Sequence, residues 1–253
     1  MNMEFGECFF DLLKAVTVDC KDDGTAFTVN DRVAVIERML DGSSYVLAAR
    51  EPLALLYSKR LPVAGDRVLL VSSHVDCLYE RCFCSDEGEC VRGTFDNAFG
   101  NAAILWCMLN DRLPDNVVVA FTGDEERDSR GALQALGALG KLGCSVSFAL
   151  VQDVTNVGWE NGALFAIEND LGVDILTAYA VVSSLEGYSG KFAFCHNALP
   201  DESWDYAECG VPSMSLCMPV GGELHGGEGV MLRKAAVPGY CDVLCTLAGL
   251  LAG

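Results

Sequence analysis

Three carboxylates stand side by side where an apolar run of the sequence ends. In VVVAFTGDEERDSRGA (residues 117–132), Asp124, Glu125 and Glu126 follow a predicted buried strand. Neighbouring negative charges repel one another, so each disfavours the ionised form of the next. A bound metal ion would remove that penalty, because its charge dominates the local electrostatics. The segment therefore predicts a metal site, and the remaining ligands are expected at other strand ends.

Further candidate ligands end two other apolar stretches. RVLLVSSHVD (67–76) ends on His74 and Asp76, and SVSFALVQD (145–153) ends on Asp153. Neutral imidazole and carboxylates suit zinc or a similar divalent ion. Residues two apart on a strand face the same side, so Asp76 can reach the imidazole ring of His74 and fix its tautomer.

Two more candidates lie at a helix start and in a glycine-rich loop. Asp96 opens the predicted helix of GTFDNAFG (93–100), where the helix N-terminus favours an anion. His225 lies in ELHGGEG (223–229), whose glycines let the backbone approach a site closely. Each feature is weak alone, and it is their order along the chain that indicates a single site.

Hydrophobic periodicity predicts the elements that position these residues. Strands are expected at 45–49, 53–58, 67–76, 116–126, 145–153 and 212–219, and helices at 5–15, 30–40, 96–110, 129–143 and 233–252. Apolar strands alternating with helices predict an α/β fold of three layers (α/β/α) around a mostly parallel mixed sheet. In such folds ligands bind beyond the carboxyl ends of the strands, which is where the candidate ligands lie.

Composition excludes several classes of function. The 253 residues are 51% hydrophobic and carry a net charge of −19, so the protein is globular and presents no basic face to nucleic acid or anionic lipid. No stretch approaches 18 apolar residues and no signal peptide is recognised, which predicts a protein without a membrane span. With 13 cysteines and no export signal, we expect a reducing cytoplasm and free thiols.

The order of the motifs resembles that of the co-catalytic dizinc peptidase superfamily, with its leucyl and glutamyl aminopeptidases, carboxypeptidase G-like deacylases and glutaminyl cyclases. The matching stretches are SSHVD, GTFDNAFGNAA, FTGDEERDSRGA, ALVQDVT and GVPSMSLCMPVGGELHGGE, within residues 72–228. The resemblance implies the phosphorylase/hydrolase-like fold of zinc peptidases.

The resemblance also implies a ligand set. Asp96 would bridge two metal ions, one of which would add His74 and Asp153, and the other Glu126 and His225. The cofactors implied are two divalent ions, zinc above all, although manganese and cobalt also fit these ligands.

Catalytic roles follow from the same resemblance. Glu125 would be the general base that takes a proton from a metal-bridging water and passes it to the leaving amine. Asp76 would orient His74. The superfamily commonly has a cis peptide after the bridging aspartate, so Asp96–Asn97 is a candidate for such a bond.

Ligand spacing bears on the domain organisation. Only 21 residues separate His74 from Asp96, and 71 separate Asp153 from His225. These intervals leave no room for the inserted domain or dimerisation lid found in other branches of the superfamily. We therefore expect residues 1–253 to form a single catalytic domain without a lid.

Three acidic residues depart from the superfamily pattern or extend it. Asp128 stands where a glycine is usual and could face the substrate. Asp201 falls where related enzymes have an acid that supports the metal site or the substrate amine. Glu228 could contact the His225 ring or the substrate, or it could be a solvated loop residue.

The expected activity is cleavage of an amide bond, most simply by an aminopeptidase acting on small peptides. An N-acyl amino acid deacylase or carboxypeptidase would need a cation for the substrate carboxylate, for which Arg92, Arg127 and Arg130 are candidates. A non-catalytic binding protein on the same fold and a single-metal acyltransferase like the glutaminyl cyclases remain as alternatives.

Four cysteines between the first two ligands leave one question open. Cys77, Cys82, Cys84 and Cys90 in CLYERCFCSDEGEC could bind a further metal or form a redox pair. Their spacing lacks the paired C-x2-C knuckles of zinc sites, so free thiols are the alternative.

Overall fold

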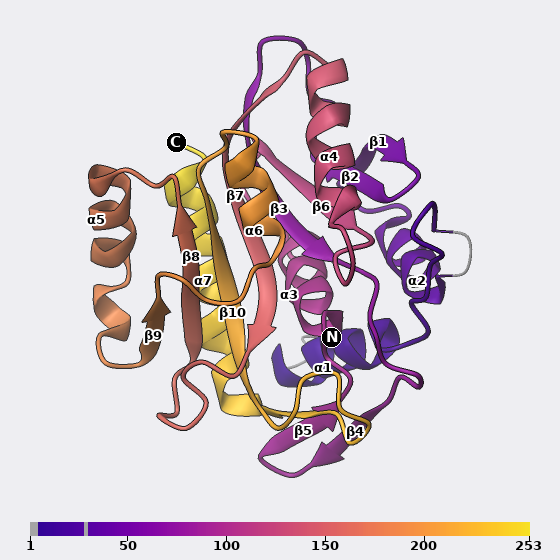
Figure 1. Cartoon of the computed structure of the whole chain (residues 1–253), viewed down its shortest axis with the longest axis vertical. Coiled ribbons are helices and arrows are strands. Elements are labelled where there is room, and N and C mark those ends of the chain that lie inside the picture. The colour runs from indigo at the N-terminus through magenta and orange to yellow at the C-terminus, as the bar shows by residue number, and fades with distance from the viewer. Residues whose placement is uncertain (1–4, 28–29) are drawn as a thin grey trace.

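The computed structural model describes residues 5–27 and 30–253 and is built around one twisted sheet (Figure 1). Four parallel strands form its centre, in the order β6-β3-β7-β10. They are β3 (Arg67–His74), β6 (Val117–Thr122), β7 (Ser145–Thr155) and β10 (Ser213–Gly221). Parallel alignment brings the carboxyl ends of all four to the same edge of the sheet.

Antiparallel strands extend the sheet on both sides and make it mixed. On the β6 side lie β2 (Ala54–Ser58) and β1 (Val46–Glu51), and on the β10 side lie β8 (Phe165–Leu171) and β9 (Phe192–Cys195). The end of β10 also continues into a narrow ribbon of β11 (Val230–Arg233), β5 (Cys90–Gly93) and β4 (Cys84–Glu87). The expected mixed, mostly parallel sheet is confirmed.

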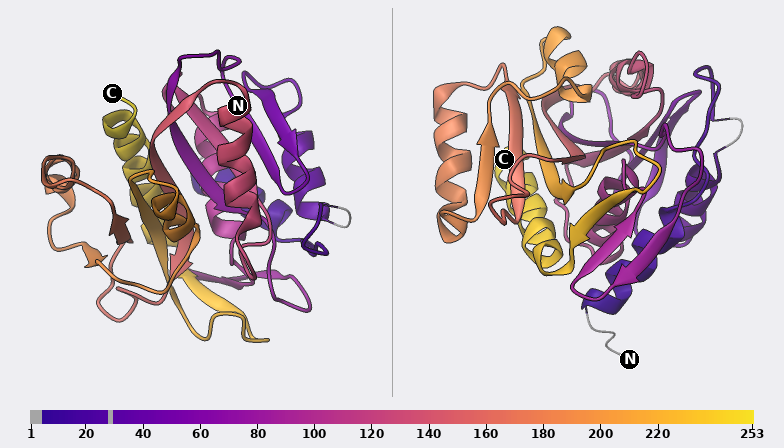
Figure 2. Two further views of the ribbon diagram at one scale, coloured as in Figure 1. Left: turned by 45° about the horizontal axis from the view of Figure 1, so that its top comes forward. Right: turned by 60° about the horizontal axis from the view of Figure 1, so that its bottom comes forward.

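Helices cover both faces of the sheet, which gives the three layers. One face is covered by α1 (Phe5–Val16), α2 (Asp31–Leu40), α3 (Ala98–Leu109) and α7 (Val237–Leu251), and the other by α4 (Arg130–Lys141) and α6 (Glu202–Glu208). Helix α5 (Ile175–Ser184) packs beside α7 at one end of the molecule, opposite the N-terminal helices (Figure 2).

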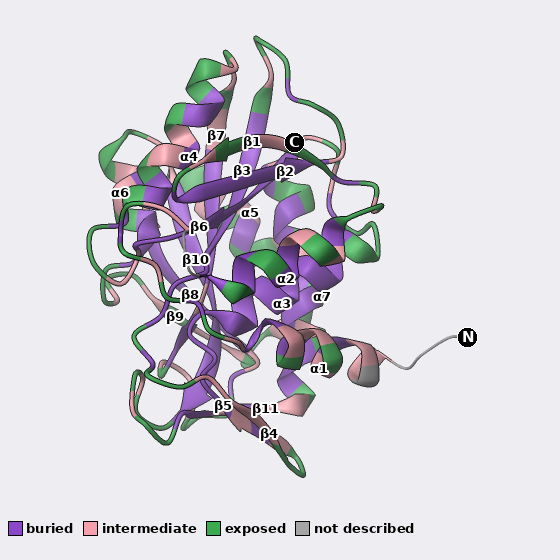
Figure 3. Cartoon of the chain, turned by 90° about the vertical axis from the view of Figure 1, so that its right-hand side faces the viewer, coloured by how far each residue is buried: buried purple, intermediate pink, exposed green. Residues whose placement is uncertain are grey.

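Side chains of the central strands alternate between the two helical layers. In β3, Leu69 and Val71 join the core under α3 and α7, whereas Val68 and Leu70 join the core under α4. The strands are therefore buried along nearly their whole length (Figure 3). Each fully buried leucine or valine stabilises the fold by about 1.5–3 kcal/mol, which explains the continuous apolar runs in the sequence.

The expected elements are present, with shifted ends. The final helix begins at Val237, after a 3-10 turn over Lys234–Ala236, and Asn30 caps α2 by accepting a hydrogen bond from the backbone N–H of Val33 at 3.0 Å. The β4–β5 hairpin and most of the helices and strands between residues 165 and 208 were not predicted from the sequence.

One described segment has the length and mean hydropathy of a membrane span, contrary to the expectation that none would. It is Lys234–Leu251, with a mean hydropathy of 1.2, and half of it is buried inside the protein. Tyr240, Val243 and Leu244 lie in the main core. The segment is therefore a helix of the protein interior.

Glu202 gives the fold a pH-dependent element. Its side chain is fully buried between α6 and β3, where one oxygen accepts a hydrogen bond from Ser72 Oγ at 2.8 Å and the other, Oε1, has no partner. Burial raises the pKa of Glu202 to about 7. Between pH 4.5 and about pH 7 the folded protein keeps a proton on Glu202 that the unfolded chain has released. The free energy of unfolding therefore falls as the pH rises through this range.

We expect Glu202→Gln to stabilise the protein at pH 8 by about 1–3 kcal/mol, because the amide removes the cost of burying a charge. Urea unfolding at pH 8 and at pH 4.5 would measure the gain, which should shrink toward the lower pH. Glu208→Gln, at the exposed end of the same helix, is the control. An equal gain at both pH values would contradict the assignment.

Candidate metal centre

The first group of donors gathers around His74, the last residue of β3. His74 Nε2 lies 3.0 Å from Asp96 Oδ1 and 3.7 Å from Asp153 Oδ1. Asp153 lies near the end of the neighbouring strand β7, and Asp96 precedes Asn97, the N-cap of α3. Parallel pairing of β3 with β7 places the histidine and Asp153 together at the sheet edge.

The second group shares Asp96 with the first. His225 Nε2 lies 2.8 Å from Asp96 Oδ2 and 3.4 Å from Glu126 Oε2. His225 comes from the loop between β10 and β11, and Glu126 from the turn after β6. The two oxygens of Asp96 thus face two different histidines, as a carboxylate that bridges two ions would.

These residues fit divalent ions. The donor atoms of His74, Asp96 and Asp153 lie within 4.8 Å of one another, as do those of Asp96, Glu126 and His225. His74 Nε2 and Glu126 Oε1 are buried and make no hydrogen bond, an expensive arrangement unless a ligand completes it. Two imidazoles and three carboxylates form a donor set that zinc prefers.

Asp76 connects this site to the turn of acidic residues. One of its oxygens lies 3.5 Å from His74 Nδ1, and the two oxygens face the backbone N–H groups of Glu125 and Glu126 at 3.3 Å each. The backbone carbonyl of Asp76 also lies 3.1 Å from His74 Nδ1. Asp76 therefore lies where it can orient the histidine and hold the turn that carries both glutamates.

The side chains of two asparagines hold the backbone of the strands that carry the candidate ligands. Asn97 donates from Nδ2 to the carbonyl of Gln152 and accepts from the backbone N–H of Gly100 at 2.9 Å, which caps α3. Asn101 donates to the carbonyl of His74 at 2.7 Å. The Asp96–Asn97 peptide is cis, as the resemblance implies.

The charges of the site shift its pKa values in opposite directions. Burial, with the repulsion of neighbouring acids, raises the pKa of Glu126 to about 7 and that of Asp153 to about 6. Burial would also raise the pKa of Asp96, but the adjacent imidazoles of His225 and His74 outweigh it and hold that pKa below its usual range. The centre thus attracts cations or protons.

Glu125 lies beside the donors and has the largest shift of these acids. Burial, then the charges of Asp153, Asp96 and Glu126, raise its pKa to about 9, although His74 opposes them. Its Oε2 lies 3.9 Å from His74 Nε2. A carboxylate with so raised a pKa beside a metal centre is suited to accept a proton.

Asp124 is not part of the centre. Its left-handed backbone (φ 67°) turns the chain, and its carbonyl accepts hydrogen bonds from the N–H groups of the three residues at 127–129. Its buried carboxylate pairs with Arg130 at 2.6 and 3.2 Å. One carboxylate of the acidic turn is thus neutralised by an arginine, and the other two face the metal centre.

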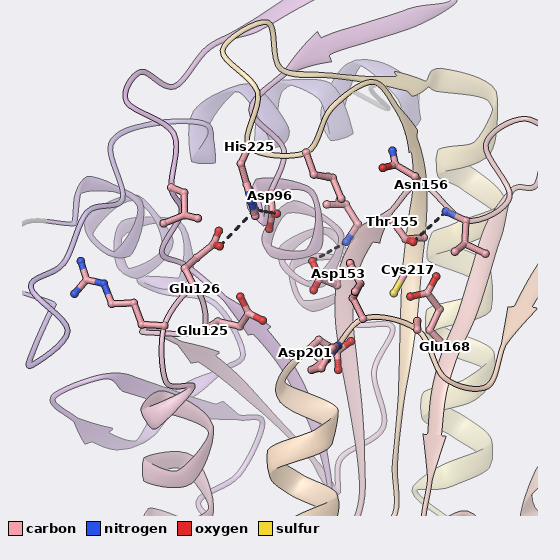
Figure 4. A pocket seen from close by; sticks show the side chains of 18 residues that line it. Asp96, Glu125, Glu126, Asp153, Thr155, Asn156, Glu168, Asp201, Cys217 and His225 are labelled. Carbon is pink, nitrogen blue, oxygen red and sulfur yellow. Dashed lines mark hydrogen bonds and ion pairs between the residues drawn. The ribbon is translucent and has the colours of Figure 1, made fainter.

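The centre opens into a cavity of about 530 Å³ (Figure 4). All the donors except the buried His74 line one side, and Glu168, Asp201 and Cys217 line the other. Asp201 is an N-cap of α6, accepting from the backbone N–H of Ser203 at 2.9 Å and from the hydroxyl of Ser215. It therefore has a structural role as well as a place in the cavity wall.

Glu168, on β8, was not singled out from the sequence. It is 5% exposed, and its Oε1 is buried without a hydrogen-bond partner. Burial raises its pKa to about 7, and the neighbouring charges of Asp201 and Asp153 add to the shift. An unpaired carboxylate oxygen at the cavity wall is suited to accept a hydrogen bond from a ligand.

Two sequence candidates lie outside the cavity wall. Glu228 and Asp128 are exposed, and neither lines the cavity. A tyrosine that the sequence analysis did not consider contacts the centre instead. Tyr79 Oη accepts from the backbone N–H of His225 at 3.3 Å, and the two rings meet edge to face at 6.0 Å.

No protein-family model and no curated protein sequence matches this chain. Solved structures do match. A TET aminopeptidase from a marine sediment archaeon of the Thaumarchaeota has a TM-score of 0.73, over 95% of this chain and 96% of its own, at 10% identity. The TET1 peptidase of Pyrococcus horikoshii has a TM-score of 0.67, covering 95% and 99%, at 15% identity.

A tripeptidase from Staphylococcus aureus covers 99% of this chain and 100% of its own, with a TM-score of 0.67 and 11% identity. The chain therefore has a fold found in solved aminopeptidases and a tripeptidase. At the level of the fold, this agrees with the resemblance to the dizinc peptidase superfamily that the motifs carry.

We expect His225→Ala to reduce the metal content of zinc-soaked, desalted protein from two ions to one per chain. His225 is a donor in one group only, so the group with His74 and Asp153 stays intact. Elemental analysis provides the measurement. Glu228→Ala, three residues further along and exposed, should keep both ions. Loss of neither ion in His225→Ala would remove this residue from the ligand set.

Proposed function

We propose that this chain is a dizinc metallopeptidase that removes the N-terminal residue from small peptides, with Glu125 as its general base. The observation that carries the proposal is the pair of donor groups that share Asp96, beside a raised-pKa glutamate in one cavity. The fold shared with solved aminopeptidases supports it. We further propose that residues 1–253 act as one catalytic domain.

Five residues would hold the ions, three to each: His74, Asp153 and Asp96 for one, and Glu126, His225 and the same Asp96 for the other. Two divalent ions so held would polarise the scissile carbonyl and make water acidic enough to attack near neutral pH. Zinc suits these donors best, and manganese and cobalt are also compatible.

Glu125 would move the proton. Its carboxylate would accept a proton from the attacking water and deliver it to the nitrogen of the leaving amine as the amide bond breaks. Bound cations would lower its pKa from the value of about 9 in the metal-free centre toward neutrality, where a general base works best. Asp76 would act through His74 and the turn, as a positioning residue.

The side of the cavity lined by Glu168 and Asp201, here called the acidic wall, would bind the free N-terminus of the substrate. Glu168 offers a buried, unpaired oxygen, which matches the hydrogen-bonding needs of an ammonium group. The alternative, recognition of a carboxylate by a deacylase or carboxypeptidase, needs a cation in the wall. Arg127 lines the cavity but is exposed, whereas Arg130 is paired with Asp124 and Arg92 with Glu87. The wall therefore favours an aminopeptidase.

The cysteines support a reducing compartment. All 13 are free in the structure, which is usual for a protein of the cytoplasm, where we place the enzyme.

We expect Glu125→Gln to lower kcat by about 10²–10⁴-fold, the usual contribution of a general base, while both ions stay bound. Initial rates on amino-acid p-nitroanilides, with elemental analysis of the same samples, would measure this. Asp128→Asn is the matched control, an exposed acid in the same turn. Retained turnover in Glu125→Gln would contradict the assignment of Glu125 as the base. No turnover by the wild type with two ions bound would indicate a binding protein.

We expect Glu168→Gln to raise KM for free-amine substrates by about 10–100-fold, the value of a hydrogen bond to a charged group, with a smaller change in kcat. In the wild type, KM should fall as the pH rises from 6 to 7.5, because Glu168 ionises near pH 7, and the variant should lose this dependence. N-acyl amino acids serve as the comparison substrates. Faster cleavage of these would favour the deacylase.

A further inference from the structure

Three thiols meet at the loop after β3, and none of them lines the cavity. Cys77 and Cys82 lie in the loop after β3, and Cys20 lies in the segment between α1 and α2. Their sulfur atoms lie within 4.8 Å of one another, and those of Cys20 and Cys77 are 2.7 Å apart. Cys84 and Cys90 lie on β4 and β5 and do not join them.

A buried positive charge lies beside these thiols. Arg32 is 0% exposed and donates to the carbonyls of Val16 at 2.8 Å and Val75 at 3.1 Å, while its Nη2 has no partner. Among the described residues, no carboxylate forms an ion pair with it. The charge of the guanidinium acts to lower the pKa of all three cysteines, but hydrogen bonding among the thiols and burial raise the pKa values of Cys20 and Cys77, and only that of Cys82 is lowered. A buried charge needs a counter-charge, and thiolates are the groups at hand.

We propose that Cys20, Cys77 and Cys82 bind one thiophilic divalent metal ion, of the kind represented by zinc. Three thiolates, the guanidinium of Arg32 and a divalent ion together are electrically neutral: one thiolate balances the arginine, and the ion balances the other two. Thiolate sulfur is the donor that such ions prefer. A metal ion uses all three sulfur atoms, whereas a disulfide uses two and leaves the third unexplained.

The geometry requires only a local adjustment. Zinc–sulfur bonds of about 2.3 Å place tetrahedral sulfur atoms roughly 3.8 Å apart, so Cys20 and Cys77 would separate by about 1 Å on binding. Cys82 is partly exposed and offers an entry path. No fourth histidine, cysteine or carboxylate of the described chain joins the group, so solvent would complete the coordination.

The ion would be structural, and its position gives it a role. The loop that it fastens carries Leu78, which lines the cavity, and Tyr79, which contacts His225. Cys20 ties that loop to the N-terminal segment. The ion would therefore hold the rim of the candidate active site against the N-terminal helices, whatever reaction the cavity performs.

Cadmium titration of the full-length chain, kept reduced with a phosphine, tests the site. Sulfur-to-cadmium charge transfer absorbs in the ultraviolet, and the histidine and carboxylate donors of the cavity give no such band. We expect the band to saturate at one tightly bound equivalent. Cys82→Ser should weaken that binding by at least about 10-fold, the smallest loss seen even for residues that only support a ligand, and Cys20→Ser should do the same.

Cys245→Ser is the matched control, since Cys245 is also partly buried and its sulfur lies 3.5 Å from that of Cys107. It should leave the band unchanged. The loss in Cys82→Ser should persist in the His225→Ala background, which separates this site from the cavity. An absent band, an equal loss in Cys245→Ser, or a Cys20–Cys77 disulfide found by peptide mapping of the untreated protein would overturn the proposal.

Discussion

The constraint on which the site depends is the concentration of negative charge at one desolvated edge of the sheet. Glu125, Glu126 and Asp153 all have raised pKa values, because burial and mutual repulsion disfavour their ionised forms. The imidazoles of His74 and His225 lie among these acids, and each faces one oxygen of Asp96. The fold thus brings together acids whose mutual repulsion protons or metal ions would relieve.

The parallel order of the strands brings these acids to one edge of the sheet, and the carboxylate of Asp76 links two of the strand ends. Strands β6, β3 and β7 are neighbours and point the same way, so the residues after each strand meet at one edge. Asp76 then joins two of these strand ends, since it faces both the ring of His74 and the N–H groups of the turn after β6. A shift of either strand by one residue would separate the histidine from the glutamates.

The sequence predicted the parts of the site that depend on local pattern. His74, Asp76 and Asp153 could be placed because each lies at the end of a continuous apolar stretch. Asp96, at a helix start, and His225, in a glycine-rich loop, had weaker local signals, which the order of the motifs and the superfamily resemblance strengthened. Glu168 was missed because it lies inside a strand whose place in the sheet depends on antiparallel pairing with β10. The Cys20–Cys77 contact joins residues 57 apart in sequence, a long-range packing that no local periodicity encodes.

The two sides of the cavity differ in how far the sequence predicts them. The side of the cavity that carries the candidate metal ligands is formed largely at the ends of central strands. The apolar runs of these strands allow it to be predicted from the sequence. The opposite wall combines Cys217 of the central strand β10 with Glu168 of β8 and Asp201 at the start of α6, and the sequence did not predict β8 or α6. In the proposed function, the first side would carry the reaction chemistry and the second would select the substrate. The charge of the second wall, above all the unpaired oxygen of Glu168, would therefore distinguish an enzyme for free amino termini from one for carboxylates.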